Sequence, residues 1–559
     1  MQALINIVMF IRKRFSFSRT YLFFALLAAT SLVNADWVNL TGAETSPNIA
    51  EIYVLDNQVN VKLEVYIGDL EKFEELIPDD WITDPKIKRA SLEQRMQTFA
   101  AERFRFITED GTKLSAKLEL VEPRMRVDRK SAFAGMINPY TKQRVQAAPE
   151  DKRVLYAEII YPFDKKPQQL TIVPPTDERG NAIASIGFIT YHKAVPVIDF
   201  RFLGQSAKLT LDWQDPWYTK FDNKNLTRHH KDPLMLFLYV EPRQVRLESL
   251  MRFSDIVEMT GFNVDDVQEN LKDKHQRLEL HIKKFHAEKQ ALNIDGQAVK
   301  PDSIRVEFLS ATLSGLKVVE DSTTVDEASL LVGVSQQIFV EALPQKVDSQ
   351  WQYFNQHIDR IPFTATDPVG PFQGLITKDD PEFSWQNFLK KYQEPVMQPV
   401  VVETGWNIDL PYFGKTKIVK QMPKQEQALS IVEGLLENSR IAFIEKEPNK
   451  LSQALGEVIN SKQSEAVAEE LAKLFSPKVT GGAVGAVQLF KNVQVINVRE
   501  LTKSDGFSAT VAGEAIISAQ HWGHVDQRQL SFQLLLDLDE EDTQWRLVDL
   551  TVVDIKEIK

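Results

Sequence analysis

The chain repeats part of its own sequence, and this repeat limits what it can fold into. The segment Ile52–Val59 returns farther along as Leu238–Val245, and the correspondence continues without a gap to Asp69 and Asp255. Self-similarity at a fixed offset is typical of a duplicated structural unit. The alternative is that two ordinary strands with similar patterning match by chance. The repeat predicts two related units, and no catalytic motif accompanies either copy.

The similarity extends along both units. Asp110-Gly111 aligns with Asp295-Gly296, and an Asp-Gly pair between apolar runs favours a hairpin turn because both residues tolerate positive φ. The later matches are Tyr156–Glu158 with Phe339–Glu341, and Leu211–Trp213 with Phe383–Trp385. The offset becomes slightly smaller across these matches, which small loop deletions explain.

Each unit is predicted to be β-rich with one inserted helix. Apolar residues alternate with period two between Ala50 and Asp69, which places one face of a hairpin on a core. A helix is predicted for Ser91–Ala101, where Ser91 and Gln94 have the spacing of a capping box, and a longer one for Asp265–His286. Many short strands with one helix favour a sandwich or a small barrel. The predicted fold class is multidomain and mainly β, with two duplicated β-sandwich-like domains.

The C-terminal part follows a different pattern. Helices are predicted for Lys424–Ala442, Lys450–Ile459 and Ser464–Phe475, and four strands follow near 487–499, 507–520, 526–538 and 544–554. In the third strand apolar and polar residues alternate, so one face packs on helices while the other meets water. Three helices on a curved antiparallel sheet describe an α+β cone, and this order of elements resembles the SnoaL or nuclear-transport-factor superfamily.

The first 35 residues are predicted to be an export signal. Basic residues from Arg12 to Arg19 precede an apolar run from Tyr21 to Leu32, and Val33-Asn34-Ala35 offers small residues for cleavage. The run falls short of the ~20 apolar residues of a membrane-spanning helix, although an uncleaved N-terminal membrane anchor is the alternative. The predicted organisation is therefore 1–35 signal peptide, 36–215 first β-rich domain, 216–235 aromatic and histidine-rich segment, 236–393 second β-rich domain, 394–423 linker with a short strand at Val400–Glu403, and 424–559 SnoaL-like domain. The predicted location is the periplasm or another exported compartment.

Composition excludes several classes of protein. The chain has no cysteine, which removes disulfides, thiolate nucleophiles, Cys-ligated zinc and iron–sulfur clusters. Cleavage after Ala35 would remove four basic residues and no acidic ones, and the formal net charge would fall from −12 to −16. A polyanion is repelled by nucleic acid and by anionic membrane surfaces, so neither is expected as the main partner.

Three segments carry a family resemblance: Tyr191–Arg201, then Asp215–Tyr218 with Arg228–Met235, and finally His521–His524 with Gln527-Arg528. On these segments the chain resembles a group of uncharacterised bacterial envelope proteins with paired β-rich domains followed by a SnoaL-like domain. The resemblance covers most of the mature chain and implies architecture, with no assigned reaction. Some members of the group have a membrane segment before the last domain, whereas residues 394–423 contain nothing apolar enough.

The junction between the two β-rich units is one candidate site. Trp213, Trp217, Tyr218, His229 and His230 lie close together in the sequence there, and aromatic rings can hold a ligand with a polar handle for orientation. Such residues more often fix two domains to each other. A metal would need a third ligand such as His192, because adjacent histidine side chains diverge.

A second candidate lies in the last domain, where His521 and His524 are three positions apart. On one continuous strand these side chains would point to opposite faces, and a bulge at Gly523 could make them converge. SnoaL-like domains can be enzymes that use an Asp–His pair, for which Asp526 or Asp549 is available. Packing in the core or at a turn is the alternative role.

The preferred hypothesis is a non-catalytic exported protein that binds or scaffolds another envelope component. In this hypothesis the last domain forms a homodimer or holds a small apolar ligand, and no cofactor is expected. One alternative is a ligand carrier or enzyme using the cavity of the cone. Another is a periplasmic metal-binding partner of a transporter, using His192, His229 and His230. A cone filled by Phe443, Phe475 and Trp522 would favour the preferred hypothesis over the enzyme.

Overall fold

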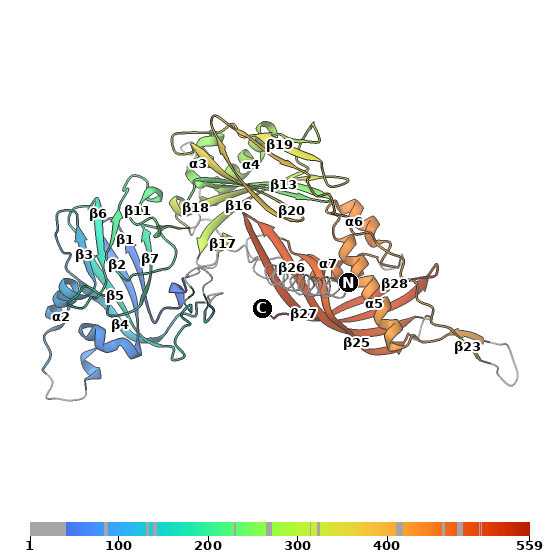
Figure 1. Ribbon diagram of the computed structural model, residues 1–559, viewed down its shortest axis with the longest axis horizontal. Helices are drawn as coiled ribbons and strands as arrows, with labels where there is room; N and C mark the ends of the chain where they lie inside the picture. Colours follow the sequence, from blue (N-terminus) through green and yellow to red (C-terminus); the bar gives the residue numbers. More distant parts are fainter. Residues whose placement is uncertain are drawn as a thin grey trace, which may run out of the picture.

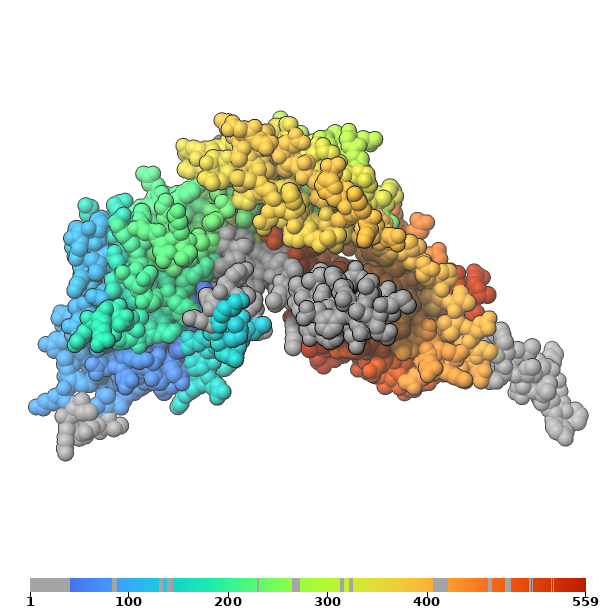
Figure 2. Space-filling view, in the orientation of Figure 1, coloured from blue at the N-terminus to red at the C-terminus, as the bar shows by residue number. Residues whose placement is uncertain are grey.

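The computed structural model describes residues 41–82, 88–129, 134–137, 142, 144–228, 231–263, 271–312, 315–320, 325–409, 417–460, 464–477, 484–501, 504 and 506–558. It forms an arch in which a central β unit lies between the first β unit and the C-terminal domain (Figure 1). In the space-filling view the central unit contacts both neighbours (Figure 2). Within the described ranges, no helix combines the length and apolarity that crossing a membrane requires.

The first unit contains two sheets around one core. The larger sheet has the order β4-β5-β2-β1-β7-β8, with β9 beside β7, and the smaller has the order β11-β10-β6-β3. Its strands are β1 (Asn48–Val54), β2 (Gln58–Tyr66), β3 (Arg105–Thr108), β4 (Lys117–Met125), β5 (Arg153–Pro162), β6 (Gln169–Val173), β7 (Ile186–His192), β8 (Val195–Pro196), β9 (Arg201–Phe202), β10 (Ala207–Thr210) and β11 (Lys220–Phe221). Its helical elements are η1 (Ala43–Thr45), η2 (Ile67–Leu76), η3 (Asp79–Trp81), α2 (Leu92–Thr98), the π-helix η4 (Phe99–Arg103) and η5 (Pro216–Tyr218).

The second unit has the same plan. Its larger sheet has the order β17-β16-β18-β13-β12-β20-β21, and its smaller sheet has the order β15-β14-β19-β22. The strands are β12 (Leu234–Glu241), β13 (Gln244–Arg252), β14 (Leu292–Ile294), β15 (Gln297–Val299), β16 (Ser303–Thr312), β17 (Gly315–Val318), β18 (Leu330–Phe339), β19 (Lys346–Gln350), β20 (Arg360–Asp367), β21 (Gly370–Thr377) and β22 (Glu382–Gln386). The helical elements are α3 (Phe253–Thr260), α4 (Leu271–Lys289) and η7 (Glu327–Ser329).

The central strands of the two units correspond. At the offset of the sequence repeat, β1 and β2 fall on β12 and β13, and the bounds of β2 coincide with those of β13. In each unit one parallel pair, β1 with β7 and β12 with β20, stands among antiparallel neighbours. Glu109 accepts the backbone N–H groups of Gln168 and Gln169, and Asp295 accepts those of Gln345 and Lys346. The sequence repeat therefore corresponds to two units of one topology.

Three of the sequence alignments are wrong in register. The bonds above match Asp295 with Glu109, one position before Asp110 in the loop, and the other two errors lie in strands. Tyr161 lies opposite Val59 and Ile338 lies opposite Val245, so Tyr161 matches Ile338, and Phe339 does not match Tyr156. In the smaller sheets, Thr210 pairs with Gln169 and Gln386 pairs with Lys346, so Thr210 corresponds to Gln386. Trp385 therefore corresponds to Leu209 and not to Trp213. Both strand errors are shifts by an even number of positions. An even shift leaves every side chain on its own face of a strand, so the alternating pattern does not detect it.

The predicted helices occur, with changed limits. Ser91 caps α2, and Gln94 completes the capping box, as the spacing indicates. The helix predicted for Asp265–His286 is α4, Leu271–Lys289, with residues 264–270 outside the described ranges. The strand predicted at Val400–Glu403 is wrong, because this stretch makes single bonds to Trp545 through the carbonyls of Val400 and Val402 and forms no ladder.

The C-terminal domain lays three helices on one face of a four-stranded antiparallel sheet (Figure 1). The helices are α5 (Gln425–Ala442), α6 (Pro448–Leu455) and α7 (Ser464–Phe475), and the strands, in sheet order, are β25 (Ala486–Glu500), β26 (Phe507–His521), β27 (His524–Glu541) and β28 (Gln544–Glu557). Before it, β23 (Trp406–Asp409) and β24 (Lys417–Lys420) form a two-stranded ribbon. The alternating apolar residues of β27 face the helices, as the sequence pattern predicts.

Candidate functional site

The junction segment after β10 fixes the first unit to the second. Asp215 accepts the backbone N–H of Trp217 at 3.0 Å with one carboxylate oxygen, and its other oxygen pairs with Arg252 of β13 at 2.7 Å. The Trp217 ring is buried between two guanidinium groups, at 3.9 Å from Arg228 and 5.4 Å from Arg252. Tyr218 stacks on His357 of the second unit at 5.0 Å. Trp217 and Tyr218 therefore contribute to packing between the units.

His192 is packed as a neutral core residue. Its ring is fully buried, its Nδ1 lies 2.6 Å from the hydroxyl of Thr219, and Trp213 meets it edge-on at 4.5 Å. Burial, assisted by the charge of Lys193, lowers the pKa of His192 to about 4. His229 and His230 lie outside the described residues, so their proposed convergence with His192 is untested. Within the described ranges, no cluster of three or more His, Cys, Asp or Glu residues could hold a metal.

The hairpin between β26 and β27 inserts into the second unit. Trp522 and Gly523 form its two-residue turn with φ values of 47° and 79°, the left-handed pair that a type I′ turn requires. The Trp522 N–H donates to the buried carboxylate of Glu248 at 2.6 Å, and the Gly523 N–H donates to the Tyr239 hydroxyl at 2.9 Å. Arg246 donates to the carbonyl of Gln520 at 2.6 Å. The tip of this hairpin is therefore bonded at three points to β12 and β13.

A glycine makes room for the Trp522 ring. The ring is fully buried, and a Cβ added at Gly333 of β18 would lie 2.4 Å from its Cη2. A Cβ at Gly523 would lie 2.3 Å from the ring of Phe237. Trp522 and Trp217 belong to one apolar cluster on the same sheet face of the second unit, together with Val195, Phe237, Tyr239, Leu250, Leu309, Leu316 and Leu331. This cluster joins all three parts of the arch.

The corresponding face of the first unit has no such slot. Gly333 lies opposite Leu250 in the second unit, and Tyr156 lies opposite Glu64 in the first. Strand pairing therefore places Tyr156 at the position that corresponds to Gly333. The position of Glu248 is occupied by the exposed Lys62, which offers no acceptor to an N–H group. A ring and a reversed charge therefore occupy the corresponding positions of the first unit, and among the described residues the hairpin tip bonds to β12 and β13 of the second.

His521 does not meet Asp549, one of the two suggested carboxylates, and the side chain of the other, Asp526, lies outside the described set. His521 and His524 are directly opposed across the two-residue turn, so their backbone positions share a face, and the expected divergence along one strand is wrong, as is the bulge at Gly523. His521 is buried at the tip, and the side chain of His524 lies outside the described set. Asp549 is exposed and pairs through Asp537 with Ser508, at the far end of β26. Thirteen residues at ~3.3 Å each separate it from His521 by roughly 40 Å, so these two residues form no catalytic pair.

Aromatic rings fill the interior of the C-terminal domain. Phe443 stacks on Phe475 at 5.2 Å, and Phe490 meets Phe475 at 5.6 Å and Phe532 at 5.8 Å. Phe443 and Phe475, two of the three residues expected to fill the interior of this domain, therefore do so. Trp522, the third, lies in the second unit because the hairpin projects beyond the sheet's own core.

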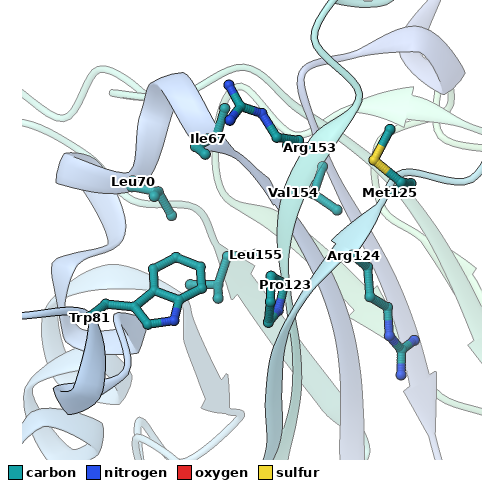
Figure 3. Close-up of a pocket in the computed structure, with 9 residues that line it drawn as sticks. All are labelled: Ile67, Leu70, Trp81, Pro123, Arg124, Met125, Arg153, Val154 and Leu155. Carbon is teal, nitrogen blue, oxygen red and sulfur yellow. The ribbon is translucent and has the colours of Figure 1, made fainter.

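An apolar groove in the first unit was not anticipated from the sequence. It has a volume of about 290 Å³ and is lined by Ile67, Leu70, Trp81, Pro123, Arg124, Met125, Arg153, Val154 and Leu155. The Trp81 ring forms one wall and faces Pro123 and Leu155, whereas the Arg124 guanidinium points away (Figure 3). These residues come from four separate elements and share no spacing, so no sequence signal brings them together. A second cavity of about 200 Å³ lies where Arg243 bridges Glu394 and Glu445.

Comparisons with known proteins give no family. No protein-family model matches the chain, and no curated protein matches it. Among solved structures, the crystal structure of the intermembrane space region of the chloroplast protein ARC6 is similar at a TM-score of 0.18 and 12% identity, covering 23% of this chain and 95% of that chain. A similarity at this TM-score supports no argument about fold or function.

Proposed function

We propose that the chain is a non-catalytic exported protein of the bacterial cell envelope that binds or scaffolds another envelope component. The observation that supports this proposal is that the candidate aromatic and histidine side chains pack within and between the three parts of the chain. Trp217, His192 and Trp522 are buried in packing within or between the units, and the half-buried Tyr218 stacks on His357 of the second unit. Residues used in this way hold three parts in one arrangement, which is what a scaffold needs and a reaction does not.

The C-terminal domain is proposed to be a SnoaL-like cone with a structural role. Three helices precede four antiparallel strands and cover one face of their sheet. The stacked rings of Phe443 and Phe475 occupy its interior, with Phe490 edge-on to Phe475, which favours a scaffold over a ligand carrier. Its hairpin then serves as the connection to the second β unit.

Crosslinking in the native envelope tests this function. A photoreactive residue is placed at exposed positions on each of the three parts, and adducts are identified by mass spectrometry. A reproducible protein adduct from at least one position is expected. The proposal is wrong if every position yields only the uncrosslinked chain, or if the purified protein turns over an envelope component that it was thought only to bind.

A further inference from the structure

The groove of the first unit corresponds to a place that the second unit fills with its own helix. Ile67 and Leu70 follow β2 as Phe253 and Ile256 follow β13. Strand pairing gives the second match. In the first unit Pro123 lies opposite Leu155, and Leu155 lies opposite Val65. In the second unit Phe308 lies opposite Val332, and Val332 lies opposite Met251. The groove-lining positions Ile67 and Pro123 thus match Phe253 and Phe308.

In the second unit the first turns of α4 cover these positions. His275 is buried, stacks on Phe308 at 4.8 Å and meets Phe253 edge-on at 5.4 Å. The neighbouring Lys274 ties the helix to Glu327 at 2.7 Å. One planar ring on an anchored helix therefore occupies the equivalent of the groove.

The described part of the first unit contains no counterpart of these turns. The strands β3 and β14 correspond, and both follow the helix of their unit. Counting residues back from these strands matches Leu92, the first residue of α2, with Leu278, which lies about two turns after the start of α4. Leu278 is fully buried, whereas Leu92 is 44% exposed. Trp81 and Met125, at the wall and rim of the groove, are 37% and 64% exposed.

The strand β16 of the second unit also has a further neighbour, β17, at its sheet edge. β17 pairs with β16 from Leu309 onward, a position that matches Arg124 of β4. Among the described strands, β4 ends its sheet without such a neighbour. In the second unit, α4 and β17 cover an apolar surface. In the described part of the first unit, the corresponding surface is exposed at the groove.

We propose that this groove receives an amphipathic helix of a partner protein, with one aromatic or imidazole ring placed as His275 is placed in the second unit. This inference rests on the proposed binding function and names the surface and the partner's chemistry. A volume of about 290 Å³ is at the lower limit of small-molecule sites and suits a single side chain. An amphipathic helix that presents an aromatic anchor to a groove is a recurrent mode of recognition. Arg124 and Arg153 already pair with Glu122 and Asp151, so the groove selects an apolar face rather than a charge.

The test uses the full chain with a photoreactive residue at Met125, compared with one at Phe388, which is exposed on the second unit. The captured protein is identified, purified and titrated into the full chain. We expect its affinity to fall at least tenfold with Trp81→Ala and with Met125→Glu, and to stay within twofold with Phe388→Ala. Unchanged thermal unfolding of both groove variants shows that folding is intact, and the crosslinked peptide is expected to come from a helix with an aromatic residue.

Other outcomes would overturn the inference. An extractable lipid adduct at Met125 would make the groove a lipid site, and an adduct of twice the chain's mass would assign it to a second copy. An affinity unaffected by Trp81→Ala would place the partner elsewhere, which leaves the proposed scaffold function intact. Loss of all capture from every position would instead remove the function itself.

Discussion

The slot for Trp522 gives the sharpest prediction. Replacing Gly333 by alanine adds one methyl group whose Cβ would lie 2.4, 2.6 and 2.7 Å from three ring carbons of Trp522. Such distances are not tolerated, so the ring has to move. The ring is fully buried and Gly523 is held against Phe237, which leaves it little room for a small shift. We expect Gly333→Ala to loosen the contact between the C-terminal domain and the second unit.

The expected cost follows from the contacts that the hairpin makes. Overpacking a buried site by a methyl group costs about 1–3 kcal/mol. If the ring is expelled instead, the loss approaches the roughly 3–5 kcal/mol of a buried Trp→Ala change, plus about 1–3 kcal/mol for the N–H bond to the Glu248 carboxylate. For a domain of this size, each kcal/mol of destabilisation lowers the melting temperature by roughly 3–5 °C, so overpacking alone should lower it by about 3–15 °C.

Calorimetry and hydrogen exchange measure the effect. Gly333→Ala is expected to separate the unfolding of the C-terminal domain from that of the second unit, and to speed exchange of the Trp522 and Gly523 amides. The matched control is Gly204→Ala, because a Cβ there meets nothing within 4 Å and Gly204 has no positive φ. Equal melting temperatures for the two variants, with both amides still protected, would refute the argument.

Three further predictions concern other parts of the chain. Glu248→Gln keeps an acceptor for Trp522 but removes the carboxylate that lies 3.2 Å from the largely buried Arg246. Urea unfolding should show a loss of up to about 3–5 kcal/mol. The exposed pair Lys556–Asp554 should tolerate Asp554→Asn within about 1 kcal/mol. Burial lowers the pKa of His192 and of His286 to about 4. Because the unfolded state binds protons more readily, the free energy of unfolding should be highest above about pH 6.5 and should fall between pH 6.5 and 4. A urea midpoint that stays constant over that range would contradict this. N-terminal sequencing of the protein from its native envelope should begin at Asp36, whereas a retained Met1 would support the anchor.

Much of the architecture could be predicted, because the repeat and the period-two alternation are local signals. The hairpin between Ala50 and Asp69, the Ser91 cap of α2 and the order of elements from α5 to β28 all follow from nearest neighbours along the chain. The errors occurred where a pattern permits several answers. A strand match shifted by an even number of positions looks equally good, and His521 and His524 share a face only because a turn, and not a strand, lies between them.

The sequence by itself determined the two-fold β plan, the change of pattern near residue 424 and the residues rich enough in chemistry to be candidate sites. Only the tertiary structure decided their roles. Whether Trp522 fills its own domain or another depends on a missing side chain at Gly333, which belongs to a different unit of the chain. The groove beside Trp81 exists because a helix that is long in one unit is short in the other. Contacts between distant segments depend on where the folded chain leaves space for a side chain. The alternation of apolar and polar residues along one segment does not show where that space lies.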